Sequence, residues 1–489
     1  MENKKEVQFW PMMVTVFIGS FVVMLSSSTI NIALPYLMTN LNTDLDTAKW
    51  AITGFMLTMG TTAPMAASLG EKISYKRLYL LSIAGFAAVS LLAVFSSNIY
   101  MLITIRFLQG FFGGVTVPAT MAIIYQVIPK EKQVTAISIW SIAPTLAPAV
   151  GPTISGFLIQ YFSWKAIFII NIPLGIIAII MGLIFMPYYK LTTDKSLDKL
   201  GIILSVITST SLLFAFSEGS VFGWGSALII ALLITGAVFM VLFIAWELHT
   251  EHPVLNLRAF KYPKFLFGVI ISCIINIALY SGTFMTPIFL QDIQGMAPLD
   301  SALVLLPASI TMAILMPIVG KLYKRIGTTP LIVAGILLIS LGTWRMTLLA
   351  VNTDHSYIRI WMALRYIGLA LATMPASYAG MSILPKELSG YGSSIINWMK
   401  QMVACLSIGI FSSLLTSRAA YHISALTSLA TNTSIQAVKA IGYVMGIDDV
   451  YSISCIVILI ALPFSFFLRK GKENTNDLAE APQDKNSVK

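Results

Sequence analysis

The sequence predicts an all-α integral membrane protein with fourteen spanning helices in two related halves. Three observations predict this fold class: an apolar composition, many apolar runs of spanning length, and a charged turn that recurs in the second half. Of 489 residues, 57% are hydrophobic and 11% are charged, against roughly 45–50% and about 25% in soluble domains. Most of the chain therefore cannot face water, and we expect it to lie in a lipid bilayer.

Fourteen runs qualify as spans, because a bilayer core about 30 Å thick requires about 20 apolar residues per helix. They cover residues 11–36, 48–69, 78–96, 100–125, 133–159, 165–186, 201–217, 226–246, 265–290, 300–320, 329–349, 358–382, 395–416 and 450–468. The seventh run is diluted by serine and threonine. The first run is too long for a signal peptide and lacks a small-residue cleavage site, so we expect a retained span.

Most of the 31 basic residues fall on one side of these spans, in the amino-terminal segment, alternate loops and the tail. Loops rich in lysine and arginine stay in the cytoplasm. We therefore expect a multi-pass protein of the plasma membrane with both termini cytoplasmic. The net charge of +10 follows from this rule and from attraction to anionic lipid, so no nucleic-acid partner is expected.

A short charged turn occurs once in each half, at Ala67 to Arg77 and at Gly320 to Pro330. An arginine follows each turn, Arg106 in one half and Arg365 in the other, roughly two helical turns inside an apolar run. An unpaired charge at that depth is costly and usually marks a transport pathway. A duplicated set of helices with a charge at matching depth is typical of a secondary transporter, whose substrate site lies between the copies.

The repeat also predicts the domain organisation. We expect an N-terminal six-helix bundle at 1–189, two accessory spanning helices with linkers at 190–260, a C-terminal six-helix bundle at 261–470 and a disordered cytoplasmic tail at 471–489. The tail is polar and mixed in charge, a composition typical of disorder.

The first charged turn resembles the loop between helices 2 and 3 of the major facilitator superfamily, with the pattern Gly-x-Leu-Ala-Asp-Arg-x-Gly-Arg-Lys. It departs from this pattern at Ala67, Glu71, Lys72 and Ser74, which keeps the charge type and loses both glycines. The second turn keeps both glycines but has no acid. In the family this loop is a conformational latch, in which the acid pairs in one conformation and releases in the other.

The resemblance implies a latch formed by Glu71, Lys72, Arg77 and Arg325. For the basic residues, a solvated loop that merely satisfies the positive-inside rule stays open as the alternative.

The segment Arg106-x-x-Gln109-Gly110 resembles the fourth-helix motif of the same superfamily. There the arginine organises the pathway and influences proton transfer, which implies that role for Arg106 and Gln109. Arg365 has the matching position in the second half but lacks the following glutamine. The alternative is a structural arginine whose donors are satisfied by carbonyls and hydroxyls of the first helix.

In the run 133–159, small residues recur every fourth position and are interleaved with prolines. Small residues let two helix backbones approach closely, and proline lets a helix bend. Ala147 to Gly156 resembles the antiporter motif Gly-x-x-x-Gly-Pro-x-x-Gly-Gly, which is found in facilitators that export. The residues that carry this resemblance are Pro148, Gly151, Pro152 and Gly156. A tightly packed static helix is the alternative.

The fourteen runs, the segment Trp164 to Gly175 and the segment Leu290-Gln291-x-x-Gln294-Gly295 together resemble the fourteen-helix drug:proton antiporter branch, often called EmrB/QacA-like. This implies the major-facilitator fold, two six-helix bundles plus two accessory helices, and multidrug or antibiotic efflux by proton antiport. The first helix also matches the branch, except that Ser26 replaces its aspartate. We therefore expect Ser26 and Asn31 to line the substrate and proton pathway.

None of the 21 acidic residues lies deep inside a predicted span. Glu218 and Asp292, near span ends, are the candidate coupling acids. The spans contain four cations, Arg106, Arg345, Arg365 and Lys400. A cavity lined by such cations without a carboxylate has a positive potential and favours neutral or anionic amphiphiles over lipophilic cations.

The sequence does not predict an enzyme, because it has no phosphate-binding Gly-x-x-x-x-Gly-Lys-[Ser/Thr] loop, no metal-ligand cluster and no plausible catalytic triad. No cofactor or metal is expected. The sequence thus predicts a monomeric, proton-coupled exporter of small amphiphiles. Two alternatives stay open: a dedicated exporter or facilitator of one metabolite or lipid-like anion, and a membrane receptor or scaffold that transports nothing.

Overall fold

The structure is a computed structural model that describes residues 8–188, 197–429 and 434–468. All regular structure in these ranges is helical. The helices before the first gap are α1 (Phe9–Asn40), α2 (Leu45–Thr62), α3 (Met65–Ile73), α4 (Tyr75–Val94), α5 (Ile99–Val127), α6 (Lys130–Trp140), α7 (Ile142–Tyr161), α8 (Ala166–Ile169) and α9 (Asn171–Phe185).

The remaining helices follow the gap at residues 189–196. They are α10 (Lys199–Phe222), α11 (Ala227–His249), η1 (Leu257–Lys261), α12 (Pro263–Ile288), η2 (Phe289–Ile293), α13 (Pro298–Ile326), α14 (Thr328–Arg345), η3 (Met346–Leu348), α15 (His355–Met381), α16 (Lys386–Leu429), α17 (Ile435–Leu459) and α18 (Ala461–Phe466). The predicted disordered tail at 471–489 and the predicted boundary at 189/190 lie outside the described residues.

Each of the fourteen predicted spans coincides with one helix or with two consecutive helices. By length and apolarity, however, only eleven helices of the described residues could cross a membrane, or twelve if the segments Lys130–Pro148 and Val150–Tyr161, which meet at a bend within α7, count as one span. The prediction of fourteen spans is therefore not confirmed. The two spans that fall short are α2, which is rich in threonine, and α15, which carries Arg359 and Arg365.

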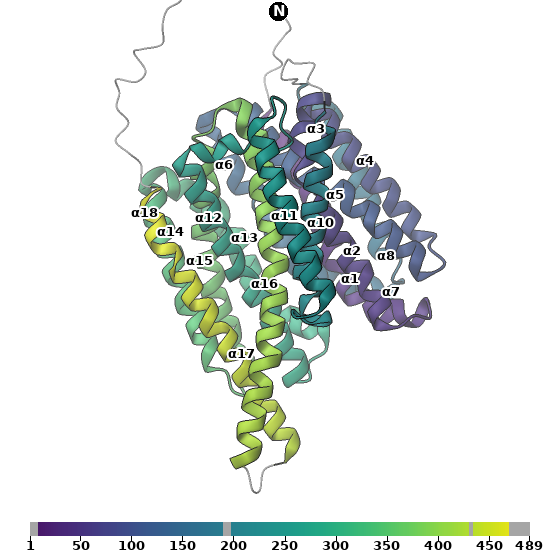
Figure 1. The fold of residues 1–489 in the computed structure, drawn as a ribbon, viewed down its shortest axis with the longest axis vertical. Coiled ribbons are helices and arrows are strands. Elements are labelled where there is room, and N and C mark those ends of the chain that lie inside the picture. The colour runs from purple at the N-terminus through teal and green to yellow at the C-terminus, as the bar shows by residue number, and fades with distance from the viewer. Residues whose placement is uncertain (1–7, 189–196, 430–433, 469–489) are drawn as a thin grey trace, which may run out of the picture.

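The helices form two groups with a pair between them. Helices α1 to α9 pack against one another and form the N-terminal group, and helices α12 to α18 form the C-terminal group. Helices α10 and α11, here called the accessory pair, lie between the two groups in the view of Figure 1. Helix α3 lies at one end of the molecule, the α3 end. The α16–α17 hairpin projects from the other, the hairpin end.

Helix α10 contacts both groups through polar side chains. Thr210 shares a hydrogen bond of 3.3 Å with Thr61 of α2, and the indole N–H of Trp398 in α16 donates to Ser209 Oγ at 2.9 Å. Within apolar surroundings, such hydroxyl and indole groups require partners. The accessory pair therefore occupies the position between α2 and α16.

The two charged turns share a residue with positive φ at the same place. Ser74, between α3 and α4, has φ 80°, and Gly327, between α13 and α14, has φ 88°. A residue with a Cβ rarely adopts positive φ, whereas glycine does so freely. The chain therefore keeps the turn in the first half although it lacks the glycine there, and Ser74 compensates in part because its Oγ accepts from the Arg77 N–H at 3.3 Å.

Replacement of Ser74 by glycine should stabilise the protein, because glycine removes the strain of positive φ. We expect a gain of roughly 1 kcal/mol, reduced by a few tenths for the lost cap. The reciprocal change Gly327→Ser should lower stability by a similar amount. Thermal unfolding of the purified variants in detergent measures both. A Ser74→Gly variant that unfolds at a lower temperature than the parent would contradict the strain at this turn.

Candidate functional site

Arg106 of α5 is fully buried and binds three helices of the N-terminal group. Its Nε donates to the Ala51 carbonyl of α2 at 2.7 Å, and its Nη1 donates to Ser26 Oγ of α1 at 3.2 Å and to Gln109 Oε1 at 3.0 Å. Gln109 in turn donates from Nε2 to Ser90 Oγ of α4 at 2.8 Å. The structure thus brings Ser26, Arg106 and Gln109 together, and links α1, α2, α4 and α5 through them.

Close approach of α2 and α5 makes this geometry possible. Gly110 and Gly114 are one turn apart on α5, and a Cβ on either would collide with a backbone carbonyl oxygen of α2, that of Phe55 or Met59. The backbones therefore touch next to Arg106, which brings the Ala51 carbonyl within reach of Nε. The glycines that follow Arg106 in the sequence are therefore the cause of this close approach.

Arg365 of α15 has the same role in the packing of the C-terminal group. It is fully buried. Its Nε donates to Thr343 Oγ1 of α14 at 2.8 Å, and its Nη2 donates to the Ala278 carbonyl and to Ser281 Oγ of α12. Like Arg106, it takes its hydrogen-bond acceptors from its own group, although Nη2 of Arg106 has none among the described residues. The predicted part of both arginines in the pathway stays a prediction.

The two groups are joined at the α3 end by hydrogen bonds. Glu71 of α3 is 5% exposed, and its Oε2 accepts from the Tyr391 hydroxyl of α16 at 2.6 Å. The hydroxyl of Ser393, half a turn along α16, donates to the Pro118 carbonyl of α5 at 2.8 Å. Lys324 of α13 donates to the Glu131 carbonyl of α6 at 2.9 Å. We call these contacts the α3-end closure.

The other predicted latch residues, Lys72, Arg77 and Arg325, are exposed, and Arg77 lies 5.2 Å from the ring of Tyr188 in its own group. Sequence reasoning missed Tyr391 and Lys324 as the cross-group partners. Lys324 is a basic residue of the second charged turn, and that position could have indicated its role. Nothing in the sequence around Tyr391 indicates its role.

Helix α7, which carries the antiporter-like motif, contacts both groups. Ser28 of α1 donates to the Pro148 carbonyl at 3.0 Å, and Ser155 donates to the Thr29 carbonyl of α1 at 2.7 Å. Gly151 packs against Ser28, and a Cβ on Gly156 would lie 3.2 Å from Leu299 of α13. The helix pair bends by 46° between Pro148 and Val150, next to Pro152. Small residues thus give α7 close contact with α1 and with α13 of the other group.

The remaining candidates are spread over the structure. Asn31 is exposed on α1. Glu218 on α10 is half-buried and accepts from Thr53 Oγ1 of α2 at 3.4 Å and from Ser217 at 3.3 Å. Asp292 is exposed in η2, a π-helical turn at the end of α12. The structure therefore gives the two candidate acids different surroundings, and only Glu218 contacts the N-terminal group.

Comparison with known protein families identifies the family of the chain. A family model described as Major Facilitator Superfamily matches residues 16–408. The chain belongs to the major facilitator superfamily. The resemblance in the sequence is thereby confirmed, and the protein is a membrane transporter by family, as its relatives are.

Three curated bacterial relatives match most of the chain. The uncharacterized MFS-type transporter YhcA of Bacillus subtilis is 30% identical over 97% of each chain. The lincomycin resistance protein LmrB of the same species is 29% identical over 94% of this chain and 96% of the relative. The tetracenomycin C resistance and export protein of Streptomyces glaucescens is 27% identical over 84% and 76%.

A solved structure shares the fold. The crystal structure of the human organic anion transporter MFSD10 (TETRAN) aligns with a TM-score of 0.61 over 93% of this chain and 100% of that chain, at 11% sequence identity. At that identity the likeness concerns the fold alone, and it confirms the all-helical major-facilitator fold.

The environment of Arg106 predicts the effect of restoring an acid at position 26. Arg106 Nη2 has no hydrogen-bond partner among the described residues, and Ser26 Oγ is only 3.2 Å from Nη1. A carboxylate there would complete an ion pair with a charge that is already buried, so Ser26→Asp should raise stability by on the order of 1–3 kcal/mol. The matched control Ser27→Asp adds the same charge one residue away and should lower stability. Thermal unfolding that shows no difference between the two variants would contradict the geometry.

Proposed function

We propose that this chain is a secondary active exporter of amphiphilic small molecules that works by proton-coupled antiport and alternating access in the plasma membrane. The observation that carries the proposal is the α3-end closure. Alternating access requires contacts between two groups that close one end and can open again, and the Glu71–Tyr391 hydrogen bond with its neighbours is such a contact. The names of the relatives, which include resistance and export, support the direction and substrate class.

In this mechanism the two groups rock as units, with boundaries near 1–189 and 261–470. Arg106 and Arg365 hold each unit together, and α7 supplies a contact that can slide against α13 because Gly156 presents no side chain there. The accessory pair, which lies within the predicted segment 190–260, moves with α2 and α16. By the positive-inside rule we assign the α3 end and both termini to the cytoplasm, so the α3-end closure shuts the cytoplasmic end in this mechanism.

Glu218 is the first candidate for the coupling proton. It is half-buried on α10, and Thr53 of α2 reaches across to it. A carboxyl group between moving elements can bind a proton in one conformation and lose it in the other. Asp292 is more exposed and is therefore the second candidate.

The substrates are neutral or anionic amphiphiles, because the side-chain hydrogen bonds of Arg106, Arg365 and Lys400 within the described residues go to carbonyl, hydroxyl, amide and thioether groups and to no carboxylate. A dedicated exporter of one anion is the second candidate function, and it is favoured by the position of Lys400, a partly exposed residue well inside a span. Growth inhibition of a deletion strain by a panel of antibiotics separates the two, since a drug pump protects against several compounds.

Proton-driven export from proteoliposomes tests the proposal directly. With an imposed proton gradient, the purified protein should move a fluorescent neutral amphiphile against its concentration gradient. The double variant Glu218→Gln with Asp292→Asn should keep its downhill flux. Its uphill flux should fall about tenfold or more. The exposed acid Glu251 supplies the control, and Glu251→Gln should behave like the parent. Uphill flux that is unchanged in the double variant would show that these acids do not carry the coupling.

A further inference from the structure

Lys400 differs from the other three cations of the predicted spans. Arg106 and Arg365 are fully buried and bound within their own groups. Arg345 packs against the rings of Trp344, Tyr357 and Trp361 at distances of 6.0, 5.7 and 4.6 Å. Lys400 alone among the four combines a position well inside a span with partial exposure and no aromatic cage. Lys400 is therefore the one of these four residues that keeps some exposed surface at such depth.

The position of Lys400 is well inside the bilayer. It follows the start of α16 at Lys386 by fourteen residues, which corresponds to about 21 Å along the helix axis in a span that covers Lys386–Thr427. An ammonium at such depth is costly unless it has a partner or a function. Among the described residues its side chain has one hydrogen-bond partner, Ser377 Oγ of α15 at 3.4 Å, and no carboxylate lies within ion-pair distance.

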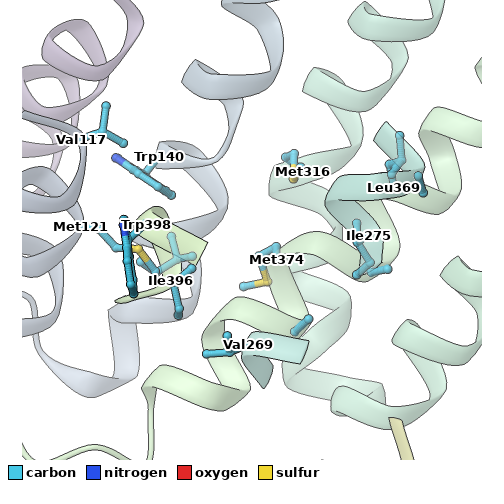
Figure 2. Close-up of a cluster of buried hydrophobic side chains, with 14 of the residues drawn as sticks. Val117, Met121, Trp140, Val269, Ile275, Met316, Leu369, Met374, Ile396 and Trp398 are labelled. Atoms are coloured by element: carbon cyan, nitrogen blue, oxygen red, sulfur yellow. The ribbon is translucent and has the colours of Figure 1, made fainter. Parts of the chain in front are cut away.

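The face of α16 that carries Lys400 is turned toward the N-terminal group. Ser393, Asn397 and Lys400 recur at helical spacing and so share one side of the helix. Ser393 donates to the Pro118 carbonyl of α5, and Asn397 approaches Met121 Sδ at 4.0 Å. Figure 2 shows Ile396 and Trp398 of the same helix beside Met121. Lys400 is therefore the first polar residue of this face beyond the contact between the groups.

Lys400 has polar neighbours on α12 and α15, and a pair of tyrosines packs on the α3 side of it. Ser377 lies 3.5 Å from Ser272 of α12, oxygen to oxygen, and Asn276 of α12 donates to the Lys400 carbonyl at 3.3 Å. Tyr378, the residue after Ser377, stacks on Tyr125 of α5 with ring centroids 6.4 Å apart. These tyrosines join the two groups on the α3 side of the ammonium.

We propose that Lys400 binds the anionic group, a carboxylate, sulfonate or phosphate, of an amphiphilic substrate. The proposal rests on the proposed function and specifies its substrate class. The ammonium has donors left for such a group, the hydroxyls of Ser272 and Ser377 can donate to it as well, and the apolar helix faces around it suit the remainder of an amphiphile. An oxyanion would also supply the countercharge that the described residues do not provide.

Binding of a matched pair of probes tests this assignment. The probes are dansyl-labelled undecanoic acid and its methyl ester, measured by fluorescence on the full-length protein in nanodiscs with empty nanodiscs subtracted. The parent should bind the acid more tightly than the ester. Lys400→Met should weaken binding of the acid by roughly tenfold to a hundredfold and leave the ester unchanged, while Lys400→Arg should restore the acid. The control Lys439→Met removes an exposed charge of the same sign and should change neither.

Binding of the ester reports that the site is intact in each variant. Equal affinity of the parent and Lys400→Met for the acid would overturn the assignment, as would equal loss of acid and ester, which would make Lys400 a structural residue. Because binding is measured without flux, either result is distinct from failure of the proposed function, which would appear as absence of export of both probes by the parent.

A lipid headgroup and a free amphiphile share the anionic chemistry, and the nanodisc composition separates them. If the natural ligand is a lipid, phosphatidylglycerol nanodiscs should reduce acid binding to the parent relative to phosphatidylcholine nanodiscs, and this reduction should vanish in Lys400→Met. If the natural ligand is a free amphiphile, binding of the acid through Lys400 should be the same in nanodiscs of either lipid.

Discussion

The burial of a guanidinium group in each half is the constraint on which the structure depends. A guanidinium keeps its charge and offers five donors, and in apolar surroundings those donors must be satisfied. Arg106 obtains acceptors from α1, α2 and its own helix, and Arg365 obtains them from α12 and α14. The neighbouring helices must therefore stay in register around each arginine. We therefore propose that each half moves as a unit, because separation of its helices would leave a charge unpaired.

The contacts between the halves have a different character. At the α3 end, hydrogen bonds between side chains, or from a side chain to a carbonyl, accompany apolar packing, and Glu71–Tyr391 is the one that involves a carboxylate. A typical hydrogen bond contributes about 1 kcal/mol, and one to a charged group roughly 1.5–3 kcal/mol. A few such bonds can close an end and can be replaced by others when the opposite end closes. In the proposed mechanism the two arginines keep each half together while the contacts between the halves change.

The sequence predicted the features that depend on composition and local geometry. Apolar runs gave the positions of the helices, and the recurrent charged turn gave the internal repeat, which the shared positive φ of Ser74 and Gly327 supports. The glycines after Arg106 indicated close packing there. The number of spans was not confirmed, because α2 and α15 are helical but too polar to qualify by apolarity.

The partners of the candidate residues could not be predicted, because they depend on how distant segments pack. Tyr391 is separated from Glu71 by 320 residues, and no local pattern around it predicts the contact. Lys72, Arg77 and Arg325 have the residue types of a latch, yet the structure leaves them exposed. Lys400 was visible only as a charge inside an apolar run. Its partial exposure beyond the contact with α5 emerged only when α12, α15 and α16 were placed around it.

The central claim is that two units, each held by its own arginine, alternately close the α3 end and the hairpin end. Spin labels at exposed positions test it most directly, with one pair at Lys72 of α3 and Glu387 of α16, and a second pair at Tyr161 of α7 and Asp300 of α13. Double electron–electron resonance in nanodiscs measures both distances across a pH series, with and without substrate. Conditions that increase the population with a long first distance should increase the population with a short second distance. A single unchanging distance for both pairs under every condition would contradict the account.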